Sequence, residues 1–124
     1  MQKINTTNAP AAIGPYSQAI EANGFLFCSG QIPLDPQTME LIGTTAAEQA
    51  EQVLKNLEAI FSEAGTSKNN VVKTTIFLNN MEDFASVNEV YANFFADHKP
   101  ARATVEVSRL PKDVLVEIEA IVCK

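Results

Sequence analysis

The stretch PARATVEVSRLPKDVLVEIE, residues 100–119, predicts two neighbouring β-strands, and the expected fold is built outward from it. Apolar and polar side chains alternate with a period of two over residues 101–107 and again over 114–122. This alternation is typical of strands that bury one face. Residues 108–113 between them have the composition of a turn, so the two strands are expected to pair as an antiparallel hairpin.

One face of this predicted hairpin carries charges. With the turn centred near residues 110–111, Arg102 and Thr104 of the first strand point to that face. Glu117 and Glu119 of the second strand lie opposite or diagonal to them. The face is either a binding site with one cation among carboxylates or a solvated surface, whose cross-strand ion pairs each contribute only about 0.2–1 kcal/mol. The stretch by itself leaves both interpretations open.

Length and charge limit the class of protein. The 124 residues predict a single domain over 1–124, because they suffice for one core and not for two independent ones. The net charge is −6 and the Lys and Arg residues are spread out, which disfavours a nucleic-acid surface. The N-terminus lacks the apolar run of a signal peptide, and no apolar run reaches the length of a membrane span. We therefore expect a cytoplasmic protein.

The cysteine and histidine content argues against metal and histidine-pair nuclease chemistry. Cys28 and Cys123 lack the CxxC spacing and the nearby histidines of a zinc site, and we interpret both as small buried hydrophobic residues. His98 is the only histidine, so His-pair nuclease and multi-histidine metal arrangements are excluded within one chain. No metal site is expected.

The remaining sequence predicts two helices among further strands. A helix is expected to begin at a Thr44 or Thr45 cap, with Glu48 completing a capping box, and to end at Gly65. The predicted strands outside the opening stretch are a short edge strand at the N-terminus, a hairpin over 16–20 and 25–29, and a central strand over 71–78. Loops are expected at 8–15 and 31–38.

The second predicted helix, residues 82–96, has a polar residue within its apolar stripe. Asn88 lies four residues after Phe84 and three before Tyr91, where an apolar side chain is expected. Its buried amide must find partners or cost about 1–3 kcal/mol. The pattern leaves open whether Asn88 bonds a loop carbonyl or contacts a ligand.

Together the elements predict an α+β sandwich, with a six-stranded, mostly antiparallel or mixed sheet and two helices on one face. Two helices cannot cover both faces of such a sheet. On the predicted register the uncovered face bears the charged residues of the opening stretch. Leu115 and Ile121 lie in the same row as Glu117, and this mixture predicts that the face is buried in a homo-oligomer.

The residue types suggest a site for a small acid. Arg102 can hold a carboxylate in a bidentate fork, and Glu117 can orient or deprotonate a water near it. Ser29 and Gly30 are either hydrogen-bonding groups of the site or plain strand-end structure. Tyr16 offers a ring wall and a hydroxyl, although residue physics alone favours ordinary strand packing.

Five segments resemble the RidA/YjgF family of reactive-intermediate deaminases over nearly the whole chain. They are APAAIGPYSQA at 9–19, SGQIP at 29–33, VKTTIFL at 72–78, VNEVYANFF at 87–95 and PARATVEVSRLPKDVLVEIEAI at 100–121. The resemblance implies a homotrimer with a chorismate-mutase-like fold and ligand sites between subunits. It also implies a 2-iminobutanoate/2-iminopropanoate deaminase that works without a cofactor.

Such proteins hydrolyse 2-aminoacrylate, 2-aminocrotonate or their imine tautomers, released by pyridoxal-phosphate dehydratases, to 2-oxo acids and ammonia. Carried over by motif, Arg102 binds the substrate carboxylate, Glu117 positions or activates water and Tyr16 walls the pocket. The other substrate-binding residues implied by the resemblance are Ser29, Gly30, Asn88 and Thr104. Only the resemblance separates Glu117 from Glu119, because spacing does not distinguish them.

This chain departs from the family pattern at two places. Many relatives have a cysteine where it has Thr104, so thiol regulation there is in doubt, whereas a hydroxyl still offers a hydrogen bond. The segment 97–99 before the PAR motif is short, which alters the rim of the cleft. Two other functions are weighed: a trimeric metabolite-binding or chaperone-like module without turnover, and a translation-inhibiting endoribonuclease, which the acidic charge and single histidine disfavour.

Overall fold

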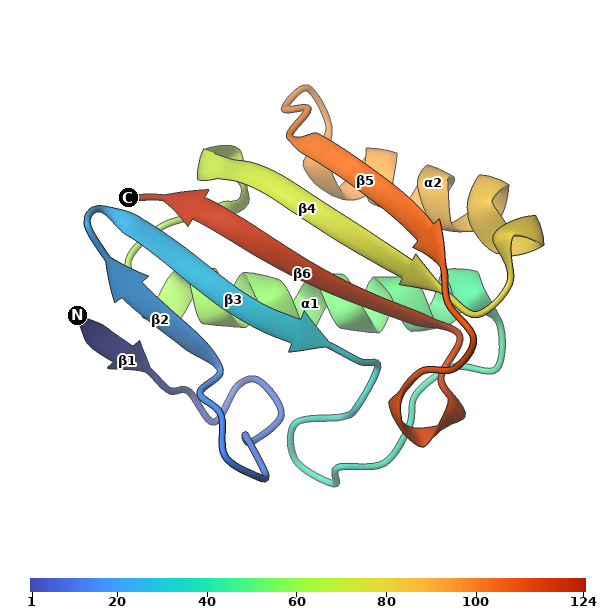
Figure 1. Ribbon diagram of the computed structural model, residues 1–124, viewed down its shortest axis with the longest axis horizontal. Helices are drawn as coiled ribbons and strands as arrows, with labels where there is room; N and C mark the ends of the chain where they lie inside the picture. Colours follow the sequence, from blue (N-terminus) through green and yellow to red (C-terminus); the bar gives the residue numbers. More distant parts are fainter.

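A computed structural model describes all residues 1–124 as a six-stranded sheet with both α-helices on one face (Figure 1), which confirms the predicted α+β class. The strands are β1 (Gln2–Ile4), β2 (Ala19–Ala22), β3 (Phe25–Gln31), β4 (Val71–Leu78), β5 (Ala101–Glu106) and β6 (Val116–Cys123), and the helices are α1 (Ala46–Glu63) and α2 (Phe84–Phe95). Short 3₁₀ turns, η1 (Lys68–Asn70), η2 (Met81–Asp83) and η3 (Pro111–Asp113), precede β4, α2 and β6.

The two strands of the opening stretch are not neighbours, so the predicted hairpin is wrong. The strand order is β1-β2-β3-β6-β4-β5, which puts β4 between β5 and β6. β5 pairs parallel to β4, whereas β6 pairs antiparallel to both β4 and β3. The physical reason is the connection through α2, which carries the chain from β4 over one face and back beside it in the same direction.

The core lies between the helices and the face of the sheet that they cover. α1 begins as predicted: the Thr45 hydroxyl accepts from the Glu48 backbone N–H, and the Glu48 carboxylate accepts from the Thr45 N–H. Gly65 follows the helix with φ of 78°, a left-handed conformation that favours glycine. Neither α-helix combines the length and apolarity needed to cross a membrane.

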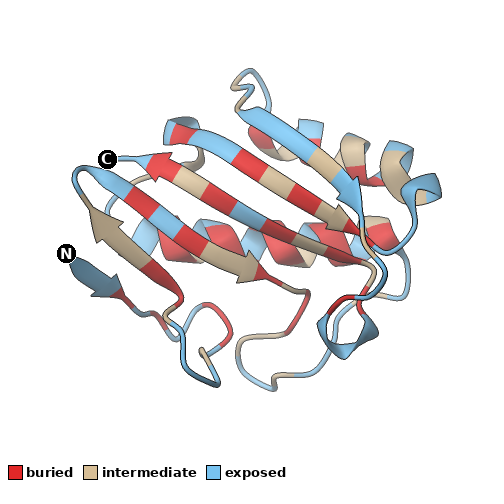
Figure 2. Cartoon of the chain, viewed as in Figure 1, coloured by how far each residue is buried: buried red, intermediate tan, exposed pale blue.

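Buried and accessible residues alternate along the central strands (Figure 2). In β6, Val116 and Ile118 are fully buried against the helices, whereas Glu117 and Glu119 point to the other face. We call that other face, which no helix covers, the open face. The prediction that the two glutamates lie on it is confirmed.

Arg102 and Thr104 lie on the opposite side, so their predicted place on the open face is wrong. The register pairs Arg102 with Thr74 of β4, and paired residues of adjacent strands share a face. Thr74 is buried and hydrogen-bonded to Tyr91 of α2. Arg102 and Thr104 therefore face α2. The face follows from hydrogen bonding to β4, which the alternation within β5 does not specify.

The N-terminal loop, rather than a strand, carries Tyr16. The strand begins only at Ala19, three residues later than predicted. Gln18 is buried and ties the loop together, because its side-chain oxygen accepts from the Thr6 N–H at 2.7 Å and its amide donates to the Pro10 carbonyl at 2.8 Å. Tyr16 is therefore held on an anchored loop, with 53% of its surface exposed.

The two cysteines differ in exposure. Cys28 is buried, as predicted, and burial raises the pKa of its thiol to about 12. Cys123 is exposed, so its predicted burial is wrong. The reason is the alternation of β6, which places Cys123 in the same row as Glu117 and Glu119 on the open face.

Candidate active site

The predicted site residues form two separate groups on the chain. One group lies where α2 meets the edge strand β5, and the other lies where β3 ends and β6 begins. The arginine group consists of Asn88, Arg102 and Thr104, and the glutamate group consists of Tyr16, Ser29, Gly30 and Glu117. β4 and the width of the sheet separate Arg102 from Glu117 in one chain, because the two side chains point to opposite faces.

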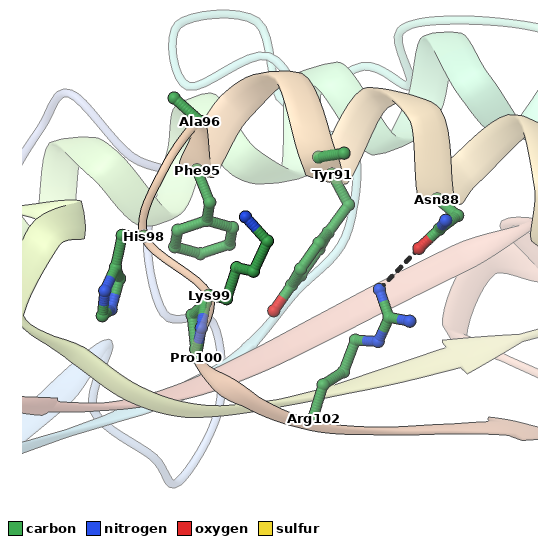
Figure 3. A pocket seen from close by; sticks show the side chains of 9 residues that line it. Asn88, Tyr91, Phe95, Ala96, His98, Lys99, Pro100 and Arg102 are labelled. Carbon is green, nitrogen blue, oxygen red and sulfur yellow. Dashed lines mark hydrogen bonds between the residues drawn. The ribbon is translucent and has the colours of Figure 1, made fainter.

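Three side chains of α2 hold the Arg102 guanidinium. Its Nη1 donates to Asn88 Oδ1 at 2.7 Å, as Figure 3 shows. The guanidinium lies 4.9 Å from the centre of the Tyr91 ring and 5.5 Å from that of Phe84, both within the range of cation–π attraction. Residues 84, 88 and 91 share one face of the helix. The Asn88 side chain makes no hydrogen bond to a loop carbonyl, and its amide oxygen orients Arg102.

A buried hydrogen bond to Thr74 holds the Tyr91 side chain in place. Its hydroxyl lies 2.6 Å from Thr74 Oγ1, and both residues are buried. Burial raises the pKa of Tyr91, although the Thr74 hydrogen bond and the nearby Arg102 charge partly oppose this. The hydroxyl pair fixes the ring against which the guanidinium stacks, so the direction of Arg102 is preset before any ligand arrives.

The Thr104 hydroxyl has no hydrogen-bond partner within the chain. Its Oγ1 is fully buried and unpaired, which costs about 1–3 kcal/mol. Thr104 lines a shallow hollow with Arg102, Phe84 and Met81. An unpaired hydroxyl beside a preset guanidinium offers a ligand one hydrogen bond in addition to an ion pair.

A cavity of about 440 Å³ holds most of the glutamate group. Tyr16, Gly30 and Glu117 line it, together with apolar walls that include Ile13 and Pro111. A cavity with apolar walls around a carboxylate and a phenol is suited to a small organic ligand and a few ordered waters.

Gly30 leaves the room that the Glu117 side chain occupies. A Cβ at position 30 would overlap the Glu117 carboxylate. The pairing of β3 with β6 is irregular between Cys28 and Gln31, so the backbone at Gly30 departs from the ladder at this point. Gly30 therefore acts in the site through its missing side chain, a role that sequence reasoning did not assign.

The cavity changes the acidity of Glu117. Desolvation of the half-buried carboxyl raises the pKa of Glu117, and the negative charge of Glu119 on the same face raises that pKa further. No cation pairs with it: the ion pairs of the chain join other residues. A carboxylate of raised pKa without a salt-bridge partner is a stronger base for a bound water than an ordinary surface glutamate.

Within the glutamate group, Ser29 makes a structural hydrogen bond, whereas Tyr16 lines the cavity. The Ser29 hydroxyl donates to the Ser17 carbonyl at 2.6 Å, which ties β3 to the N-terminal loop and favours the structural interpretation. Tyr16 lies on the loop before β2 rather than in a strand, and it lines the Glu117 cavity. The strand-packing interpretation of Tyr16 is therefore wrong.

Sequence reasoning missed four residues around the two groups. Phe84 and Tyr91 were expected to serve only the core, although their spacing from Asn88 could have indicated a shared helix face. Lys99 lines a cavity with Arg102, and Lys112 lines the Glu117 cavity. No group of three or more His, Cys, Asp or Glu side chains comes together in a way that could hold a metal ion.

Comparison with known proteins agrees with the fold. The family model described as endoribonuclease L-PSP matches residues 6–124. A mouse protein named 2-iminobutanoate/2-iminopropanoate deaminase is 51% identical over 118 residues, covering 95% of this chain and 87% of its own length. The chain belongs to the RidA/YjgF family.

Other RidA/YjgF relatives cover the chain equally well. The RutC family protein PH0854 of Pyrococcus horikoshii is 59% identical over 121 residues, which are 98% of this chain and 96% of that protein. The crystal structure of TdcF of E. coli with bound serine has a TM-score of 0.95 and 45% identity, covering 100% of this chain and 99% of that one. The whole described fold is thus that of the RidA/YjgF family.

Proposed function

We propose that this protein is a cofactor-independent deaminase that hydrolyses 2-imino acids and their enamine tautomers to 2-oxo acids and ammonia. The observation that carries the proposal is the pair of half-sites: a guanidinium preset for a carboxylate, and an unpaired carboxylate of raised pKa in an apolar cavity. The first half-site suits the acid end of the substrate and the second suits the water that attacks it.

The two half-sites belong to one active site when they come from two copies of the chain. We propose a homotrimer in which Arg102 of one subunit meets Glu117 of its neighbour. Apolar side chains on the open face support association, since Phe25, Phe27 and Val105 are each 38–45% exposed there. Closed symmetry lets every subunit supply one half-site to each of its two neighbours.

The proposed reaction begins with the substrate carboxylate on the Arg102 guanidinium and the Thr104 hydroxyl. Glu117, as the carboxylate, accepts a proton from a water while the water oxygen bonds to C2 of the protonated imine. The resulting carbinolamine takes the proton from Glu117 on its nitrogen. The C2–N bond then breaks with its electron pair leaving on the nitrogen, and the released ammonia takes the remaining hydroxyl proton, which gives a 2-oxo acid and ammonium. Substrate and one water balance the products.

The other residues support this chemistry by position. Asn88, Tyr91 and Phe84 keep the guanidinium in one orientation, which reduces the entropy lost on binding. Gly30 gives the Glu117 carboxylate its space, and Tyr16 closes one wall. We propose pyridoxal-phosphate dehydratases as the suppliers of the substrate, because they release enamines of this class.

The test is an assay coupled to a dehydratase acting on serine or threonine. We expect wild type to speed the appearance of 2-oxo acid. Arg102→Ala and Glu117→Gln should each lower kcat/KM by about a thousandfold, because the first removes the charge-assisted bond that positions the substrate and the second removes the base that positions and activates the water. Arg109→Ala is the matched control, since Arg109 pairs only with Asp113 at the surface. Full activity of Arg102→Ala would refute the proposal.

A mixture of the two inactive variants tests the shared site. If Arg102→Ala and Glu117→Gln subunits are unfolded and refolded together, about a quarter of the sites in random trimers combine an intact arginine with an intact glutamate. Activity should return to roughly that fraction. A mixture as inactive as its components would place both groups in one chain and contradict the trimer.

A second candidate is a binding module without turnover. The TdcF structure with bound serine favours it, because serine carries the carboxylate that Arg102 is suited to hold. Tight binding of 2-oxo acids together with no acceleration of imine hydrolysis would select this function over the deaminase.

A further inference from the structure

Arg102 stands at the middle of a groove between α2 and the edge strand β5. On one side is the shallow hollow of Thr104, Phe84 and Met81. On the other side is a cavity of about 370 Å³ between α2 and the segment 98–102. The proposed reaction uses only the first side, and the cavity between α2 and the segment 98–102 is left without a role.

Cations line this second cavity and carboxylates do not. Lys99 and Arg102 both contribute to its wall, with His98 between the helix end and Lys99, and no Asp or Glu is among its lining residues. Figure 3 shows Lys99 and Arg102 on either side of the Tyr91 side chain. In a chain of net charge −6, a cavity with only cationic charges is a local exception.

The opposite end of the groove has the reverse charge. Glu106 shares a strand face with Arg102 and Thr104, and its carboxylate accepts from the Met81 N–H at 2.8 Å. A ligand with a carboxylate on Arg102 is therefore repelled at the Glu106 end by a second negative charge and attracted at the Lys99 end. The groove has a direction along which a second anion is favourable.

The backbone that carries Lys99 is held at both ends. The His98 N–H donates to the Phe95 carbonyl at 3.1 Å, and the His98 ring nitrogen Nε2 lies 2.7 Å from the Val71 carbonyl. Pro100 follows and leads into β5. Lys99 thus extends a flexible side chain from a fixed point beside the cavity, so its ammonium group can reach an anion there.

We propose that Lys99 forms a second anionic subsite, and that the deaminase accepts 2-imino acids with a second carboxylate on the side chain. This rests on the proposed function, because Arg102 must hold the first carboxylate. The reaction keeps the same balance: 2-iminosuccinate and one water give oxaloacetate and ammonia, with the second carboxylate unchanged and bound to Lys99.

The experiment compares two imines made in the assay by flavin oxidases, with catalase present. D-Aspartate gives 2-iminosuccinate, and D-2-aminobutyrate gives 2-iminobutanoate. Semicarbazide traps the imine that survives, so faster hydrolysis lowers the initial rate of semicarbazone formation. We expect wild type to hydrolyse both, and expect Lys99→Met to lower the ratio of kcat/KM for 2-iminosuccinate to that for 2-iminobutanoate by about tenfold, the value of one charge-assisted hydrogen bond.

Lys99→Arg should keep the ratio near that of wild type, and Lys55→Met, an exposed lysine on α1, is the control for a lost surface charge. If Lys99→Met lowers both rates equally, or if wild type hydrolyses only 2-iminobutanoate, the subsite is refuted and the deaminase stands. If wild type accelerates neither imine, the proposed function itself fails.

Discussion

The arginine group and the glutamate group have opposite effects on the charge that each contains. Around Arg102, a helix supplies an amide oxygen and two ring faces that stabilise the charge without neutralising it. Around Glu117, the cavity and Glu119 disfavour the charge and leave it without a partner. The first arrangement favours binding of an anion and the second favours taking up a proton. The difference shows how two parts of one sheet can prepare one charged group to bind an anion and another to accept a proton.

Tyr91→Leu should have the largest effect on stability, and should break the arginine group alone. It removes the ring under the guanidinium and leaves the buried Thr74 hydroxyl unpaired. We expect the free energy of unfolding to fall by about 3 kcal/mol, from the cavity and the unpaired hydroxyl, and KM to rise. Chemical denaturation and steady-state kinetics measure the two effects.

Tyr91→Phe separates the hydroxyl from the ring. Tyr91→Phe should lower the free energy of unfolding by about 1–2 kcal/mol. Adding Thr74→Val should recover most of this loss, because removing both partners of a buried hydrogen bond is nearly neutral. A pH profile of activity that shifts in either variant would show that the arginine group also changes the pKa of Glu117, and would contradict the independence of the two groups.

Gly30→Ala should break the glutamate group alone. The added methyl overlaps the Glu117 carboxylate, which must move. We expect kcat to fall about a hundredfold, and a loss of about 1–3 kcal/mol in stability from overpacking. Binding of a 2-oxo acid, measured by calorimetry, should change much less than kcat. An equal loss of both would show that Glu117 contributes to binding as well.

Glu119→Gln should sharpen the contrast by lowering the pKa of Glu117. Removal of the neighbouring charge removes the smaller of the two causes that raise it, and desolvation remains. Because the base works as the carboxylate, the acid limb of kcat/KM should move to lower pH, though not as low as an ordinary glutamate. If the acid limb of the kcat/KM profile stays at the same pH, its pKa belongs to a group other than Glu117.

The raised pKa of Glu117 also predicts how the stability of the chain depends on pH. Its pKa is higher in the folded chain than in the unfolded one, so the folded state binds more protons between the two values. Its contribution to the free energy of unfolding is therefore present below the unfolded pKa and is lost as pH rises through the folded pKa. Glu117→Gln should remove this slope, which denaturation at a series of pH values measures.

Ala96→Gly should have the smallest effect, at the end of α2. Ala96 has φ of 55° and ψ of −117°, a conformation suited to glycine, and it lines the cavity beside Lys99. We expect a gain of about 1 kcal/mol in stability from relief of strain. Destabilisation of the chain would show that the alanine methyl packs usefully against its neighbours.

Local sequence patterns predicted most of the elements and half of the site geometry. The capping box at Thr45, the apolar stripe of α1 and the alternation in β6 depend on residues within one turn or one strand. Glu117 was therefore placed on the correct face. Arg102 was not, because its face depends on pairing with β4, which lies outside the stretch that carries it.

The sequence by itself determined the class of the fold and the family, and the family resemblance pointed to Arg102 and Glu117 as candidate site residues. The segments that contain them match family motifs, and period-two alternation specifies which residues of one strand share a face. Tertiary structure alone decided that β4 separates β5 from β6, and so that the two groups face opposite ways. Strand order is set by long-range hydrogen bonds and by the crossover through α2, neither of which is encoded in a single strand.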